Sequence, residues 1–196
     1  MDKPLQPESV LHSMKLRKRN NTSDESLIAA FESLFYEYWA PIYRLLLRMV
    51  TDPSEAEDLA LETFLRLYKH HPSPEAEFNT RGWLQRVASN LALQSIRSFK
   101  RREHYELNAG KDALEHAPQI HPPEIVAEKE DQRFVRQTLT HMNQRQAELL
   151  VMRYSGLAYK DIAKALNLSP TSIGPLLLRA EREFEKQYRA LTKENP

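Results

Sequence analysis

Apolar residues recur at intervals of three and four along most of the 196-residue chain, and no segment alternates steadily between apolar and polar positions. Such intervals place side chains on one face of an α-helix, whereas a half-buried strand needs a period of two. Only 4 residues are glycines. The pattern therefore predicts an all-α fold without strands.

Polar, proline-bearing segments divide this helical pattern. Residues 1–23 are polar and basic, and residues 103–124 lose the periodicity while gaining prolines and net acid. Such composition is typical of disordered tails and linkers. The sequence thus predicts a disordered basic tail (1–23), a first small helical domain (24–102), a flexible linker (103–124) and a second small helical domain (125–191).

Prolines and capping residues predict where the helices of the first domain begin. Pro41 should break or kink the first helix. The next helix should begin after Asp52, because an aspartate can cap a helix and Pro53 fits the first helical position. Thr80 is expected to cap a third helix of about 20 residues, which reaches residue 102.

The second domain contains a short helical segment, 159–166, and a last helix within 169–191, separated by the break NLS. Two helices joined by a tight turn, with Ile162, Leu166 and Ile173 facing inward, are typical of a helix-turn-helix, which places its second helix in the DNA major groove. A plain pair of packed helices is the alternative. Two further helices are expected before it, over residues 124–141 and 144–154.

The last helix contains Pro175, which would kink a helix begun at Pro170 at a cost of roughly 3 kcal/mol. A helix capped by Ser172 avoids this cost, because Pro175 then lies in the first turn, where an amide hydrogen has no helical partner. The sequence favours this later start.

Basic residues gather in one segment although the net charge is only +1. Residues 81–102 hold six basic residues and no acidic one. Basic side chains bind phosphates, and an asparagine amide can hydrogen-bond a base edge. We therefore expect this helix to bind nucleic acid through Trp83, Arg86, Asn90, Gln94, Arg97, Lys100, Arg101 and Arg102. The alternative is a solvated face whose basic last turn suits the helix dipole, with Trp83 in the core.

Acidic residues gather in the preceding helix, where Glu55, Asp58 and Glu62 share a face at helical spacing. One interpretation is a docking surface for a basic partner. The other is the usual enrichment of acids near a helix N-terminus. No histidine lies at a suitable offset for a metal site, so we expect no metal.

Several function classes are disfavoured by what the sequence lacks. The chain has no cysteine, so disulfides and Cys-ligated zinc are excluded. It shows no phosphate-cradling glycine-rich loop, HExxH motif or nucleophilic triad, so we expect neither an enzyme nor a cofactor. No apolar run of about 18 residues predicts a membrane span, and the N-terminus does not resemble a secretory signal. We expect a cytoplasmic protein.

Three segments stand in an order known from one family: DLALETFLRLY, RGWLQRVASNLALQSIRSFKRR and RQAELLVMRYSGLAYKDIAKALNLS. Together they resemble the small extracytoplasmic-function sigma factors of bacterial RNA polymerase, over about residues 26–102 and 133–189. The resemblance implies a protein that binds core RNA polymerase and promoter DNA and directs promoter-specific transcription initiation. The alternative is a stand-alone helix-turn-helix regulator that does not bind the polymerase.

The resemblance also implies roles for individual residues. The acidic helix would dock on the clamp helices of the largest polymerase subunit through Asp58, Leu59, Glu62, Thr63, Phe64 and Leu67. The basic helix would bind and melt the −10 element, with Asn90 reading a flipped-out base and phosphates held by Arg97, Lys100, Arg101 and Arg102. The second domain would contact the polymerase flap and would bind the −35 element through Ser169, Thr171, Ser172 and Arg179.

Two positions depart from the family pattern. Gly174 stands where the family commonly has a basic residue early in the recognition helix, and Leu61 stands where it often has glutamine. The expected groove-facing residues are therefore poor in charge. The resemblance leaves open whether an anti-sigma factor holds the protein.

Overall fold

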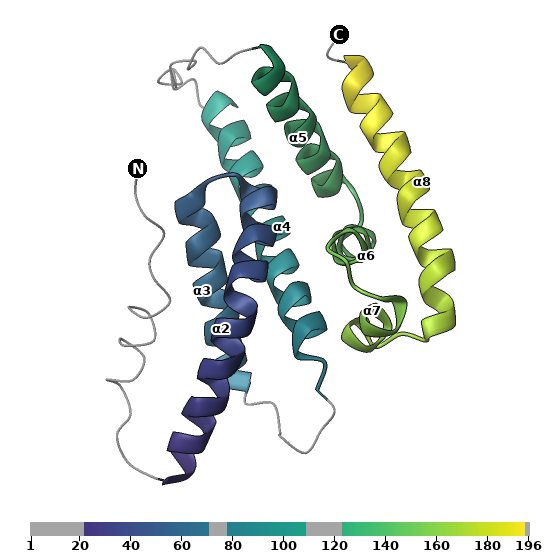
Figure 1. Cartoon of the computed structure of the whole chain (residues 1–196). Helices are drawn as coiled ribbons and strands as arrows, with labels where there is room; N and C mark the ends of the chain where they lie inside the picture. The colour runs from purple at the N-terminus through teal and green to yellow at the C-terminus, as the bar shows by residue number, and fades with distance from the viewer. Residues whose placement is uncertain (1–21, 71–77, 109–122, 195–196) are drawn as a thin grey trace. The chain divides into compact units, whose positions relative to one another are not determined.

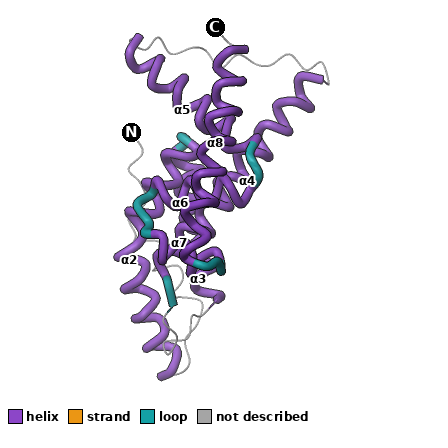
Figure 2. Tube along the Cα trace, turned by 90° about the vertical axis from the view of Figure 1, so that its right-hand side faces the viewer, coloured by secondary structure: helices purple, strands orange, loops and turns teal. Residues whose placement is uncertain are grey.

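The computed structural model describes residues 22–70, 78–108 and 123–194, and within these ranges every regular element is an α-helix (Figures 1 and 2). The all-α prediction is confirmed. The helices are α2 (Thr22–Val50), α3 (Pro53–His70), α4 (Thr80–Asn108), α5 (Pro123–His141), α6 (Gln144–Tyr154), α7 (Tyr159–Leu166) and α8 (Pro170–Glu194).

The predicted tail and linker lie mostly outside the described residues. Residues 1–21 and 109–122 are not described, whereas Thr22 and Ser23 already belong to α2. Helix α4 continues to Asn108, so residues 103–108 are helical rather than part of a linker. The limits of the two predicted domains stay predictions.

The helices group into two compact units, and the boundary between them falls within α4, between Ala88 and Ser89. The first unit contains α2, α3 and residues 80–88 of α4. The second contains the rest of α4 together with α5, α6, α7 and α8.

An aromatic cluster forms the core of the first unit, where α2 and α3 are joined by only two residues and pack against each other (Figure 1). The ring of Phe35 stacks on Trp39 with centroids 4.9 Å apart, and the ring of Phe64 from α3 lies 4.8 Å from that of Phe35. All three side chains are buried. Burial of such large apolar rings is the main source of stability in a hairpin of this size.

Pro41 lies inside α2 and does not break it. A proline lacks the amide hydrogen that would bond the carbonyl four residues earlier, here that of Glu37. Both Pro41 and Glu37 are exposed, so water can satisfy this carbonyl. The predicted break is therefore wrong, and a kink stays a prediction.

Side-chain caps fix the starts of α3 and α4. The Asp52 carboxylate accepts a hydrogen bond from the Glu55 amide at 2.7 Å, and Pro53 is the first helical residue, as predicted. At α4 the cap is Asn79, whose side-chain oxygen accepts from the Gly82 amide at 3.0 Å. Thr80, the predicted cap, is instead the first residue of the helix.

Replacing Asp52 with alanine should lower the free energy of unfolding by about 1 kcal/mol, because the amide at the start of α3 loses its acceptor. Urea unfolding monitored by circular dichroism measures the change. Asp52→Asn keeps an acceptor oxygen and should retain most of the stability. Equal losses in the two variants would contradict the cap.

The helix-turn-helix prediction is confirmed in the second unit, where α7 and α8 pack against each other. Asn167 makes the tight turn between them in the left-handed conformation, with φ of 53°. The predicted inward side chains Ile162, Leu166 and Ile173 are buried. The bounds of α6 and α7 agree with those predicted.

Helix α8 begins at Pro170 and continues through Pro175, so the predicted start after Ser172 is wrong. A residue before proline normally avoids the helical region, because the proline ring clashes with its Cβ and amide. Gly174 has no Cβ, which removes part of this clash. The carbonyl left without a partner is that of Thr171, an exposed residue near the helix start. Both features reduce the cost of an internal proline.

Candidate nucleic-acid interface

Arg86, Asn90, Gln94 and Arg97 follow one another at intervals of four, four and three residues, which places them on one face of α4. Gln94 is exposed, and Arg86, Asn90 and Arg97 are half-buried. Leu84, Ala88 and Leu91 of the same helix are buried, whereas Val87 and Ile96 are half-buried. From Arg86 to Arg97, the polar face is thus partly exposed to solvent.

Asn90 and Arg97 hold hydrogen bonds within the second unit. The Asn90 side-chain oxygen accepts from the Gln144 amide nitrogen at 3.3 Å. Arg97 donates to the carbonyl oxygens of Thr140, at 3.4 Å, and Met142, at 3.2 Å. Nucleic acid that binds these two side chains has to replace these bonds.

The structure describes the side chain of Trp83 but not those of the three basic residues near the end of the expected DNA-binding segment. Trp83 is half-buried, with its ring 6.1 Å from that of Phe78, so it neither fills the core nor stands free. Lys100, Arg101 and Arg102 continue α4, but their side chains lie outside the described part of the chain.

Charges near the start of α4 act on Tyr38 of α2. Burial, and then the hydrogen bond and the charge of Glu37, raise the pKa of the Tyr38 hydroxyl, whereas the charge of Arg81 lowers it. Arg81 is exposed. In the second unit, burial and then the charge of Arg133 lower the pKa of the Arg136 guanidinium.

The acidic face of α3 is only partly free for a partner. Asp58 is exposed, and Leu59 and Glu62 are half-buried. The Glu62 carboxylate pairs with Arg66 one turn later at 2.9 Å. Since such exposed pairs are weak, Glu62 can still face a basic partner.

Three residues expected to dock on the polymerase belong instead to the core. Thr63, Phe64 and Leu67 are at most 1% exposed. The Thr63 hydroxyl donates to the Leu59 carbonyl of its own helix at 2.8 Å. The accessible residues of the expected docking set are therefore Asp58, Leu59 and Glu62.

The start of α8 presents hydroxyl and apolar groups. Ser169, Thr171 and Arg179 are exposed and Ser172 is half-buried, and the first two hydroxyls lie 2.7 Å apart. Sequence reasoning missed Leu178, which is 50% exposed. Its spacing of seven residues from Thr171 was the signal, because residues seven apart share a helix face.

An apolar groove of about 540 Å³ lies between α5, α6 and α8, lined by Val135, Leu139, Leu150, Val151, Tyr154, Glu181 and Phe184. The sequence did not predict it. Across the described ranges, no group of three or more histidine or acidic side chains is arranged to hold a metal ion. No described helix has the length and apolar character needed to cross a membrane.

Comparison with known proteins connects these features. Residues 34–103 match the family Sigma-70 region 2, and residues 135–184 match Sigma-70 region 4. The extracytoplasmic-function RNA polymerase sigma factor SigW of Bacillus subtilis strain 168 is 28% identical over 187 residues, which cover 91% of this chain and 99% of SigW. The chain belongs to the extracytoplasmic-function group of RNA polymerase sigma factors.

Two further similarities concern the sequence and the fold, respectively. The RNA polymerase sigma-H factor of Pseudomonas aeruginosa is 28% identical over 175 residues, covering 84% of this chain and 89% of that factor. The solved structure of CnrH, in complex with the cytosolic domain of CnrY, has a similar fold, with a TM-score of 0.51 and 16% identity over 97% of this chain and all of CnrH.

The sigma factor directs promoter-specific initiation through its two regions, and it is not an enzyme. Region 2 includes α3 and most of α4, and region 4 contains the helix-turn-helix of α7 and α8. The presence of region 2 decides against a stand-alone helix-turn-helix regulator. Region 4 ends at residue 184, ten residues before the end of α8.

Proposed function

We propose that α4 of this sigma factor captures the separated strand of the −10 element. The proposal rests on the polar face of α4, where Arg86, Asn90 and Arg97 are each partly exposed. The absence of acidic residues from 81 to 102 matters because a carboxylate would repel the strand. Asn90 would read an unstacked base, and the arginines would hold phosphates.

The remaining contacts follow from the other surfaces. Asp58, Leu59 and Glu62 would dock on the clamp helices of the polymerase, and the start of α8 would enter the major groove of the −35 element. The apolar groove of α5, α6 and α8 would receive the polymerase flap. We propose that the protein acts in the cytoplasm, where the polymerase transcribes.

Binding of an anti-sigma factor is a further proposal. CnrH, which has a similar fold, binds the cytosolic domain of CnrY. A pull-down of the full chain with a candidate inhibitor, in the presence and absence of core polymerase, distinguishes an anti-sigma factor from partners that bind together with the polymerase. An inhibitor of this kind should compete with core polymerase.

The proposed function is tested by mixing the purified chain with core polymerase and a genomic DNA pool and mapping the initiation sites. We expect a shared motif around positions −10 and −35 upstream of these sites. Failure of the chain to associate with core polymerase would reject the proposal.

Alanine at Asn90 or Arg97 should weaken binding of the holoenzyme to the −10 strand while leaving core binding intact. Arg97→Ala removes one phosphate contact. The plot of log K against log salt should therefore become less steep, by about 0.7 in slope. Asn90→Ala should remove about 1–3 kcal/mol of discrimination at a single base. Fluorescence anisotropy with single-stranded −10 oligonucleotides of varied sequence measures both.

Arg44→Ala is the matched control for Arg97→Ala, because Arg44 is an exposed arginine on α2 whose side chain donates to the Ala40 carbonyl of its own helix. It removes the same charge from a different helix and should leave the salt slope unchanged. If Asn90→Ala and Arg97→Ala both bind the −10 strand like the unmodified chain, α4 is not the strand-binding helix.

A further inference from the structure

The buried side of α8 defines which residues point outward. It consists of Ile173, Leu177 and Ala180, which are at most 3% exposed. With 3.6 residues per turn, the opposite side begins with Thr171, Pro175 and Leu178. All three are exposed, and we call them the reading segment.

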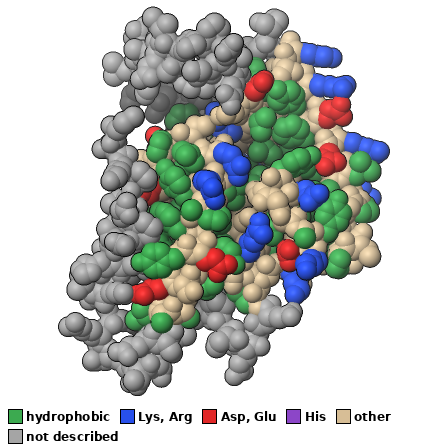
Figure 3. Space-filling view, in the orientation of Figure 1, with side chains coloured by type: hydrophobic (Ala, Val, Ile, Leu, Met, Phe, Trp, Pro, Cys, Tyr) green, Lys and Arg blue, Asp and Glu red, His purple; other side chains and the backbone are tan. Residues whose placement is uncertain are grey.

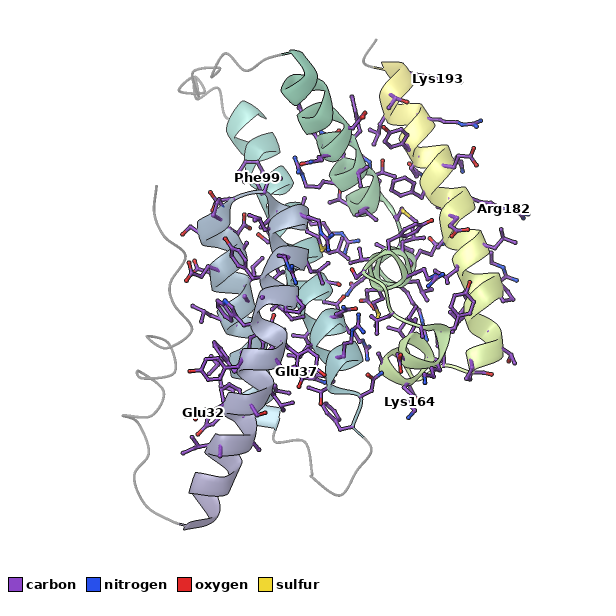
Figure 4. All side chains as sticks on the ribbon, in the orientation of Figure 1. Glu32, Glu37, Phe99, Lys164, Arg182 and Lys193 are labelled. Atoms are coloured by element: carbon purple, nitrogen blue, oxygen red, sulfur yellow. The ribbon has the colours of Figure 1, made fainter. Side chains whose placement is uncertain are left out.

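The outward side becomes basic farther along the helix. Arg182, Lys186, Arg189 and Lys193 are exposed there, and we call them the basic segment. Figure 3 shows Lys and Arg side chains along the edge where α8 lies, and Figure 4 shows Arg182 and Lys193 extending away from the neighbouring helices. Arg189 pairs with Glu185 at 2.6 Å, but both side chains are exposed and such a pair is weak.

The first nine residues of α8, 170–178, contain no Arg, Lys, Asn, Gln, Asp or Glu. A helix-turn-helix contacts base edges with the N-terminal residues of its second helix. The side chains that read guanine or adenine through paired hydrogen bonds are therefore missing from these nine residues, and the first of them, Arg179, comes only after Leu178. The chemistry that remains is that of hydroxyls and apolar groups, and apolar side chains recognise the methyl group of thymine.

We propose that the reading segment recognises the −35 element through thymine methyl groups, and that the basic segment holds the adjacent phosphates. The inference rests on the proposed contact of α8 with the −35 element. Thr171 and Arg182 are about 16 Å apart along the helix axis, whereas the major groove is about 12 Å wide. The basic segment therefore begins at the groove edge, where Arg182 meets the DNA backbone and supplies charge that the reading segment lacks.

Deoxyuridine tests the proposal, because it keeps the hydrogen-bonding groups of thymine and lacks only the methyl group. Each thymine of the −35 element in a mapped promoter is replaced in turn, and the affinity of the reconstituted holoenzyme for the duplex is measured by competition. At one or two positions the affinity should fall about fourfold, as expected for one buried methyl group. Thymines upstream of the −35 element serve as the DNA control.

The same measurement with Leu178→Ala identifies the protein group. This variant should bind the thymine promoter more weakly, and its binding should no longer respond to deoxyuridine at the position that Leu178 contacts. Leu178 is half exposed, so its loss should leave the fold intact. Leu191→Ala is the control, because it makes the same truncation at a half-buried leucine of α8 outside the reading and basic segments; it should keep the full response.

Two contrary results have different meanings. If deoxyuridine has no effect at any thymine while other base changes in the −35 element weaken binding, the methyl-reading mode is wrong and the assignment of α8 to the −35 element stands. If no change in the upstream duplex affects binding, both the reading mode and that assignment are overturned, while the −10 contact is untouched.

Discussion

Replacing Phe64 with alanine is expected to lower the free energy of unfolding of the first unit by about 3–5 kcal/mol. The ring is fully buried and lies 4.8 Å from Phe35 and 5.8 Å from Trp39. Its removal leaves a cavity between α2 and α3 that two rigid aromatic rings fill poorly. Because whole domains are stable by only about 5–15 kcal/mol, this one change should bring the unit close to unfolding.

Chemical denaturation of the full chain, followed by tryptophan fluorescence, measures this effect. Tyr36→Ala is the control, because it removes an aromatic ring that is 54% exposed on the same helix pair, and it should change stability by less than about 0.5 kcal/mol. A stable Phe64→Ala variant that fails to bind core polymerase would restore Phe64 to the docking surface and contradict its assignment to the core.

Reversing the charge of Asp58 and Glu62 together, as Asp58→Lys with Glu62→Lys, should lower the affinity for core polymerase about 10- to 100-fold. Like charges facing each other across an interface cost several kcal/mol, and opposite charges also speed association. The loss should be larger at low salt, because the Debye length grows as salt is removed. Titration of labelled core polymerase at several salt concentrations measures the affinity.

Glu37→Lys is the matched control for Asp58→Lys, because Glu37 is an exposed acid of the same unit on α2. It changes the net charge by the same amount without altering the acidic face of α3. Equal losses for the two single variants would mean that the overall charge, rather than this face, governs binding to core polymerase.

The fold was predictable from sequence where local signals agree. Helices α6 and α7 have the predicted bounds because Gly156 supplies the turn between them and the apolar period is regular. The start of α8 was not predictable in this way, because the rule against proline inside a helix considers Pro175 without its neighbours. The missing Cβ of Gly174 and the exposure of Thr171 lower that cost only in the folded context.

The candidate site was predictable as a set of faces but not as a set of accessible side chains. Helical spacing placed Asn90 and Arg97 on one face, and both are accessible. The family motif also placed Phe64 among the docking residues, and its burial became known only when α2 was seen to cover it. Spacing shows which residues share a face, whereas packing decides which face is covered.

The cap of α4 constrains the order in which two neighbouring positions can change during evolution. A Cβ at position 82 would lie 2.4 Å from the side-chain nitrogen of Asn79, the residue that caps the helix. Replacing Gly82 first therefore displaces the cap. Replacing Asn79 with a smaller residue first removes the three atoms nearest to that Cβ, so that a later side chain at position 82 no longer meets the Asn79 side chain. Lineages that reach a larger residue at position 82 should show a smaller one at position 79.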